Sequence, residues 1–170
     1  MHSHVDVRLL KEAPVARAPF QVLVLPYRQR GDGEYEFAVF RRADSGDWQA
    51  IAGGGEDAET PLDAAQREAY EEAGVPVGAP YLPLDTFASV AVTCFRDSYL
   101  WGDSVYVIPE YTFGVDLGTH DLLLSAEHNE VQWVPFAAAV ELLCYDSNRV
   151  ALWELNQKIR GLGPRESSRP

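Results

Sequence analysis

The chain has 170 residues, of which 46% are hydrophobic, and it carries a formal net charge of −12. This length and apolar content predict one globular domain over residues 1–170, with 1–18 and 162–170 as loose tails. The acidic balance excludes affinity for nucleic acid backbones and anionic membranes, and it suits a small anionic substrate only if cations screen the charge.

Cysteine usage points away from metal and disulfide scaffolds. Cys94 and Cys144 show neither CxxC spacing nor an accompanying ligand pattern. A reducing cytoplasm is therefore the expected location. No apolar run reaches the length of a membrane span. The sequence leaves open whether two copies of the chain form a homodimer.

The N-terminal third of the chain is strand-like. Gly31-Asp32-Gly33 is a turn signal between two apolar, β-rich segments, which therefore predict a hairpin. The predicted strands are Arg8–Leu10 at an edge, Phe20–Leu25, Tyr35–Arg41 and Trp48–Ala52. The glycine run Gly53–Gly55 that follows predicts a loop whose backbone turns sharply and approaches a ligand closely.

A helix is predicted from Pro61 to Ala73. Thr60 is a natural N-cap, Pro61 fits the first helical position, and Asp63 places negative charge in the first turn. Gly74 suits the left-handed conformation that ends a helix. The face opposite its acidic residues is apolar but small, which predicts close packing against a sheet.

Three glutamates, Glu68, Glu71 and Glu72, lie at i, i+3 and i+4 of this helix and share one face. Like charges at these spacings destabilise an isolated helix by about 0.2–0.5 kcal/mol per pair. A hard divalent cation removes that repulsion. The alternative is a solvated surface helix, but the glycine run, the cap and Arg67 coincide with the acids and favour the cation site.

The remainder of the chain mixes strands, loops and helices. The predicted strands are Leu84–Thr93, Val105–Val115 with Pro109 at an edge or bulge, and Glu130–Val134; the loops are 95–103 and 118–129; the helices are Phe136–Leu143 and Asn148–Ile159. Because helices are inserted among the strands without strict alternation, we expect an α/β fold with a mixed sheet sandwiched between helices.

At the acidic helix the chain resembles the Nudix hydrolase family. The family box reads G, five residues, E, seven residues, R-E-apolar-x-E-E-x-G-apolar, and the matching residues are Gly53, Glu59, Arg67, Glu68, Glu71, Glu72, Gly74 and Val75. Ala69 stands where a bulkier aliphatic residue is common, which should affect packing more than chemistry.

The resemblance implies a mixed sheet between helices and hydrolysis of a nucleoside diphosphate linked to a further group. It would make Glu68, Glu71 and Glu72 ligands of Mg²⁺, with Mn²⁺ as an alternative. Glu59 would support the metal as a nearby acid, and Arg67 would orient the glutamates. The expected partner is a small-molecule phosphoanhydride substrate.

A looser similarity extends outside the box, to the dATP or dihydroneopterin triphosphate pyrophosphohydrolase branch. It rests on the order of Trp48-Gln49, the box, Glu127-His128, Trp133 and Ser147-Asn148-Arg149. This branch implies cleavage of a triphosphate to a monophosphate and pyrophosphate. The proline-rich tryptophan array expected of NADH-cleaving members is absent from the sequence.

Further candidate residues lie outside the helix. Glu127 is the first choice for the general base, with Glu130 as the fallback, and a plain surface acid is the alternative. Gly53 and Gly54 are candidate substrate contacts. Arg41 or Arg42 is a candidate phosphate ligand because guanidinium binds phosphate bidentately, although a surface arginine is at least as common.

Aromatic residues could hold a base. Phe95, Tyr99 and Trp101 are candidates for stacking, with core or edge packing as the alternative. His128 is expected to be structural, and Asn148 could cap the last helix as readily as touch substrate.

Three functions remain open on these residues. The first is a metal-dependent pyrophosphohydrolase of a nucleoside or pterin triphosphate. The second is hydrolysis of another nucleoside diphosphate derivative, such as a nucleotide sugar or a dinucleoside polyphosphate. The third is a non-catalytic nucleotide-binding module, against which the retention of all the box glutamates counts.

Overall fold

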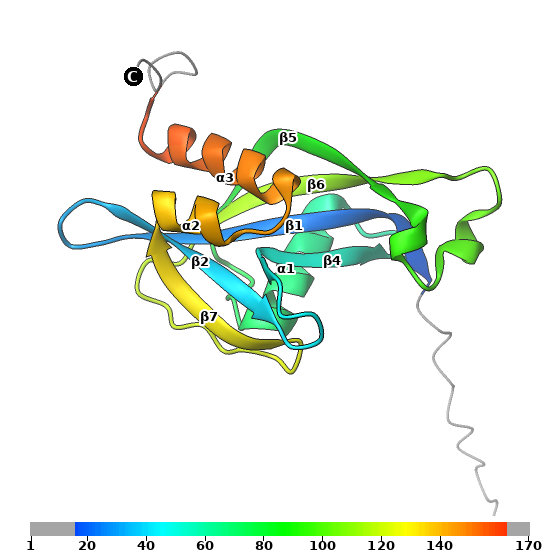
Figure 1. The fold of residues 1–170 in the computed structure, drawn as a ribbon, viewed down its shortest axis with the longest axis horizontal. Coiled ribbons are helices and arrows are strands. Elements are labelled where there is room, and N and C mark those ends of the chain that lie inside the picture. Colours follow the sequence, from blue (N-terminus) through cyan, green and yellow to red (C-terminus); the bar gives the residue numbers. More distant parts are fainter. Residues whose placement is uncertain (1–15, 163–170) are drawn as a thin grey trace, which may run out of the picture.

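The structure is a computed structural model that describes residues 16–162, and it is built on a seven-stranded sheet with helices on both faces (Figure 1). The strands are β1 (Arg17–Gln29), β2 (Tyr35–Arg42), β3 (Trp48–Gln49), β4 (Ile51–Glu56), β5 (Tyr81–Ala91), β6 (Val107–Asp116) and β7 (His128–Pro135). The helices are α1 (Pro61–Ala73), α2 (Phe136–Leu142) and α3 (Asp146–Ile159), with short 3₁₀ helices η1 (Val92–Cys94) and η2 (Ser98–Trp101). The predicted edge strand Arg8–Leu10 lies outside the described residues.

Strand β1 is the centre of the sheet. The strands follow the order β3-β2-β1-β6-β5, with β4 also paired to β1 and β7 to β2. β1 runs parallel to β6 and antiparallel to β2 and β4. The predicted mixed sheet is therefore confirmed, as is the hairpin between the first two strands.

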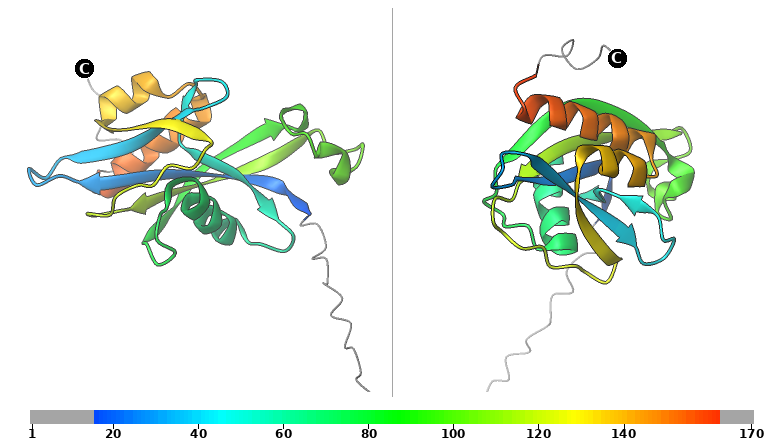
Figure 2. Two further views of the ribbon diagram at one scale, coloured as in Figure 1. Left: turned by 90° about the horizontal axis from the view of Figure 1, so that it is seen from below. Right: turned by 60° about the vertical axis from the view of Figure 1, so that its left-hand side comes forward.

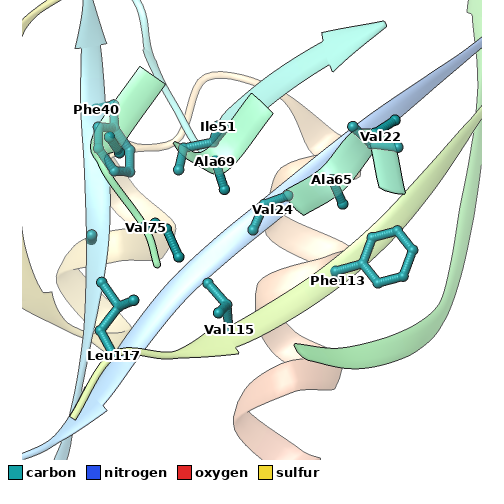
Figure 3. Close-up of a cluster of buried hydrophobic side chains, with 13 residues drawn as sticks. Val22, Val24, Phe40, Ile51, Ala65, Ala69, Val75, Phe113, Val115 and Leu117 are labelled. Atoms are coloured by element: carbon teal, nitrogen blue, oxygen red, sulfur yellow. The ribbon is translucent and has the colours of Figure 1, made fainter. Parts of the chain in front are cut away.

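The core has two layers because successive side chains of β1 point to opposite faces of the sheet. Val22 and Val24 pack with Ala65 and Ala69 of α1 on one face (Figure 3). On the other face, Leu23 and its neighbours pack against α2 and α3. Figure 2 shows α1 on one side of the sheet and the two later helices on the other. The predicted α/β sandwich is confirmed.

The glycine run was predicted as a loop, and that prediction is wrong. Gly53–Gly55 belongs to strand β4 and pairs with β1. The glycines are needed because other side chains cross the strand: a Cβ added at these three positions would lie 1.9 Å from Glu68, 2.5 Å from Arg17 and 2.0 Å from Phe20, respectively.

Two further details concern the second half of the chain. The predicted loop 95–103 contains the 3₁₀ helix η2. Pro109 pairs with β5, whereas the pairing of β6 with β1 begins only at Glu110, so Pro109 stands at a local edge as predicted. None of the helices in the described part of the chain is long and apolar enough to cross a membrane.

Candidate active site

A cavity of about 540 Å³ lies between β4, the start of β1, β6 and the first turn of α3. Its lining includes Gly53 and Gly54, the two glycines predicted as substrate contacts. Its charged lining residues are Arg17, Arg42, Glu68, Glu72, Glu110 and Glu127. The cavity therefore joins the predicted acids to residues from distant strands.

Helix α1 begins and ends as the sequence predicts. The N–H of Asp63 donates to Thr60 Oγ1 (3.2 Å) and the N–H of Thr60 donates to Asp63 Oδ2 (3.0 Å), which forms a capping box. Gly74 ends the helix with a φ of 67°. These caps fix the register of the helix and hence which face carries the acids.

Small residues bring α1 close to the sheet. Ala65, Ala69 and Ala73 are fully buried against it. This close approach places the carboxyl group of Glu68 directly over Gly53. Ala69, the box position where a larger aliphatic residue is common, is small because it lies in this contact.

Arg67 organises the acidic face through five hydrogen bonds. It holds Glu59 bidentately (2.8 and 3.0 Å) and also reaches the carbonyl of Gly54 (2.8 Å), Glu68 (3.0 Å) and Glu71 (3.3 Å). The hydrogen bond from Arg67 lowers the pKa of Glu59. The guanidinium thereby ties the helix to strand β4.

The two acids that line the cavity, Glu68 and Glu72, differ in compensating charge. Burial, then repulsion from Glu127 and Glu68, raises the pKa of Glu72 to about 9. Burial also raises the pKa of Glu68, against the opposing effect of Arg67. His128 Nδ1 lies 3.6 Å from Glu72 Oε2, and its ring packs on Phe40 at 5.2 Å. Burial lowers the pKa of His128.

The acids that line the cavity suit a hard divalent cation. Glu68, Glu72 and Glu127 share one wall, and Glu72 Oε2 is buried without a hydrogen-bond partner. Carboxylate oxygens are the ligands that Mg²⁺ prefers, and a cation would offset the charge that raises these pKa values. Across residues 16–162, no three His, Cys, Asp or Glu side chains already form a metal-ligand group.

The predicted metal ligands are therefore not equivalent in position. Glu68 and Glu72 line the cavity, whereas Glu71 and Glu59 do not. The side chain of Glu71 is 55% exposed beside Arg67. Glu59 also accepts a hydrogen bond from the N–H of Glu56 (2.9 Å), so both its oxygens are engaged.

The two candidate phosphate-binding arginines point to different places. Arg42 lines the cavity and is held by Asp44, whose carboxylate raises the pKa of the guanidinium. Arg41 instead lies 3.8 Å from Glu130 and donates to the carbonyl of Gly46 (3.3 Å). The structure brings only Arg42 to the site.

The two candidate bases separate in the same way. Glu127 lines the cavity near Glu68 and Glu72 and is exposed to solvent. Its backbone carbonyl accepts from the N–H of Ala43 (2.8 Å), which anchors the loop before β7. Glu130 faces Arg41 and Gln132 and does not line the cavity.

The far wall of the cavity contains residues that the sequence reasoning missed. Gln21 of β1 and Glu110 of β6 lie side by side in register, and Gln21 Nε2 donates to Glu110 Oε2 (2.9 Å). Each is a polar residue within an otherwise apolar strand segment. Because the two are 89 residues apart in the chain, this interruption of the apolar pattern was the only sequence signal that could have identified them as site residues.

The aromatic candidates divide in the same way as the arginines. Phe95 lines the cavity, and Trp101 packs edge-on against it at 5.6 Å while donating to the carbonyl of Arg17 (2.8 Å). Tyr99 is 74% exposed and lies outside the lining. Asn148 lines the cavity and its side chain accepts from the N–H of Ala50 (2.9 Å), between β3 and β4; it does not cap α3, whose N-cap is Tyr145.

Comparison with known sequences matches most of the chain to one family. The model of the NUDIX domain matches residues 19–153. The chain is 31% identical over 140 residues to the dihydroneopterin triphosphate diphosphatase of Escherichia coli, covering 81% of this chain and 92% of that one. It is also 30% identical over 132 residues to an octanoyltransferase of Myxococcus xanthus, of which it spans only 34%.

Solved structures agree with that placement. A NUDIX hydrolase from Listeria monocytogenes superposes with a TM-score of 0.76 at 40% identity, covering 85% of this chain and 96% of that one. The dihydroneopterin triphosphate pyrophosphohydrolase of Escherichia coli superposes with a TM-score of 0.66 at 25% identity, covering 84% and 99%.

Proposed function

Because the chain belongs to the Nudix hydrolase family, we propose that it is a metal-dependent pyrophosphohydrolase that cleaves a nucleoside or pterin triphosphate to a monophosphate and pyrophosphate. The observation that carries this proposal is the cavity wall on which Glu68, Glu72 and Glu127 meet beside Arg42. The similarity to the dihydroneopterin triphosphate enzyme supports the substrate class.

The acids of this wall would hold Mg²⁺ or Mn²⁺. Glu68 and Glu72 are the proposed ligands inside the cavity, and Glu71 is the outer member of the helix set. When bound, such an ion would screen the phosphate charges and increase the acidity of a water. Arg67 keeps Glu68 and Glu71 from collapsing onto other partners by holding both at hydrogen-bond distance.

The remaining steps belong to side chains of the protein. Glu127 accepts a proton from the attacking water, whose oxygen forms a new bond to phosphorus as the phosphoanhydride bond to the leaving group breaks. Arg42, which lines the cavity near Glu72 and Glu127, donates to a phosphate. Glu59 acts indirectly, because it holds the guanidinium of Arg67 in place.

A substrate panel with product identification tests this proposal. The purified protein with Mg²⁺ should convert nucleoside and pterin triphosphates to equal amounts of monophosphate and pyrophosphate, separated by anion-exchange chromatography. Preferential cleavage of nucleotide sugars or dinucleoside polyphosphates would instead assign the second substrate class. Tight nucleotide binding with no cleavage across the panel would contradict the enzymatic proposal.

A further inference from the structure

Glu110 is an unusual residue for the centre of a sheet. It is only 3% exposed, yet it lines the cavity, and its Oε1 atom is buried without a hydrogen-bond partner. Among residues 16–162, no lysine, arginine or histidine forms an ion pair with it. A buried carboxylate oxygen left unpaired destabilises the folded protein, so its presence calls for a ligand.

Gln21 orients this carboxylate. Its Nε2 donates to Glu110 Oε2 at 2.9 Å, and the two residues are register neighbours on parallel strands. Each carboxylate oxygen accepts more than one hydrogen bond, so Oε2 retains capacity beside the unpaired Oε1. The carboxyl group therefore offers two adjacent acceptors, held in a fixed direction.

The position of Glu110 fits the base end of a nucleotide. Gly54, Gln21 and Glu110 lie opposite one another on β4, β1 and β6, so two strand spacings, about 10 Å, separate Gly54 from Glu110. Val90 and Phe95 supply apolar surface to the same cavity, and β5, which carries Val90, pairs with β6 at Glu110. A flat ring held there would leave its phosphates to extend toward β4 and the acidic wall.

Two adjacent acceptors select a particular ring edge. Guanine and pterin both present a ring N–H next to an exocyclic amino group, which gives two neighbouring donors. Adenine and cytosine offer a donor beside an acceptor, and thymine offers one donor between two carbonyls. A carboxylate therefore pairs twice only with the 2-amino-4-oxopyrimidine edge.

We propose that Glu110, oriented by Gln21, is a specificity-determining residue that recognises the 2-amino-4-oxopyrimidine edge shared by guanine and pterin. This inference rests on the proposed pyrophosphohydrolase function and names the substrate class within it. Gln21 is the positioning residue, since its contact is with Glu110.

The test compares substrates that differ at this edge only. The wild-type protein should show a kcat/KM for dGTP at least about tenfold above that for dITP, which lacks the 2-amino group, with most of the difference in KM. Comparing dGTP with dihydroneopterin triphosphate then identifies whether guanine or pterin is preferred. Equal kcat/KM values for dGTP and dITP in the wild type would overturn the proposal without any variant.

The matched variants are Glu110→Gln and, as a control on the exposed surface of α2, Glu141→Gln. Glu110→Gln should bring the dGTP to dITP ratio close to one and favour dATP, because an amide pairs with the donor and acceptor of adenine. Glu141→Gln should leave the ratio unchanged. A Glu110→Gln protein that keeps the wild-type ratio would overturn the assignment.

Failure of the function and failure of the inference are distinguishable. If no triphosphate is cleaved, the pyrophosphohydrolase proposal fails, and calorimetric binding of dGMP against dIMP without metal still measures the edge preference. If triphosphates are cleaved with no preference for the 2-amino group, the function stands and the role of Glu110 is wrong.

Discussion

Glu72 combines deep burial with negative neighbours, and within residues 16–162 the only basic side chain at ion-pair distance is His128, whose pKa is itself lowered. Glu72 and Glu127 are the residues on which the proposed chemistry depends most. Arg67 pairs with Glu59, Glu68 and Glu71 instead. The excess negative charge is thus concentrated on the cavity wall, where a cation and a phosphate chain would meet.

Replacing Glu72 with Gln should lower turnover at least about a hundredfold, because a metal ligand is lost. The melting temperature without metal should stay the same or rise, since the substitution removes a carboxyl group whose charged form is opposed first by burial and then by Glu127 and Glu68. Steady-state kinetics and thermal unfolding measure the two effects, with Glu141→Gln as the surface control. Near-normal turnover would contradict the ligand assignment.

Replacing Glu127 with Gln should lower kcat with little change in Mg²⁺ affinity, because the proposed role is proton acceptance. Glu130→Gln is the matched control, since Glu130 follows closely in the chain but faces Arg41 away from the cavity. Kinetics combined with calorimetric Mg²⁺ titration separates the two roles. An unchanged kcat in Glu127→Gln would place the base elsewhere.

Helix α1 was predictable with correct bounds because its determinants are local. The cap at Thr60, the proline after it and the glycine at its end all act within a few residues. The glycine run before it was wrongly predicted as a loop because the contacts that require glycine there are not local. Gly53 is required by Glu68, which reaches it only after α1 packs on β4, and no local pattern reports that contact.

Gly53→Ala tests the contact between α1 and β4. The added methyl group would overlap the carboxyl end of Glu68, which is flexible and can move away. We expect turnover to fall about tenfold or more with little loss of stability, because Glu68 leaves its position over the strand. Activity and urea unfolding, measured on the same protein, check this expectation.

Gly114→Ala provides the contrast within the sheet. Its methyl group would lie 2.4 Å from Leu155 in the core beneath α3, which should cost about 1–3 kcal/mol of the free energy of unfolding. Equal destabilisation by Gly53→Ala and Gly114→Ala would contradict the expectation that the Glu68 side chain moves away from the added methyl group.

Helix α3 is attached to β5 through Glu154. Its carboxylate accepts from the N–H groups of Asp85 (2.6 Å) and Thr86 (2.7 Å) and pairs with Lys158 (2.8 Å). Burial alone would raise the pKa of Glu154, but the hydrogen bonds from Lys158 and Thr86 outweigh it and lower the pKa to about 2.

This lowered pKa predicts a pH-dependent contribution to stability. The folded pKa lies below the ordinary value of 4.5, so the stabilisation is fully present above that value and is lost as the pH falls to about 2. Glu154→Gln should therefore cost about 1–3 kcal/mol at pH 7, and its difference from wild type should shrink over that interval. Urea unfolding at a series of pH values measures this. A difference that stays constant down to pH 2 would contradict it.

For the whole molecule, sequence patterns indicated the layers and the acidic wall but not the far wall of the cavity. The mixed sheet followed from strands and helices that do not alternate. Gln21 and Glu110 meet only because β1 and β6 run parallel and in register, and strand pairing over 89 residues leaves no local trace. The choice between Arg41 and Arg42 likewise depended on how β2 ends against β7.

The net charge of −12 bears on whether the site needs a cation to bind an anionic substrate. An acidic protein attracts an anionic substrate poorly unless cations accumulate at the site. The charged groups at the cavity fit that requirement, since four glutamates and two arginines line it. Catalysis should therefore depend on a divalent cation and not merely on ionic strength.

The most direct measurement is the rate of pyrophosphate release from a triphosphate as Mg²⁺ is titrated into protein freed of metal by a chelator. We predict no release without the divalent ion and a saturable recovery as Mg²⁺ is added, with equal amounts of monophosphate formed. Release that proceeds at full rate in excess chelator would contradict the account.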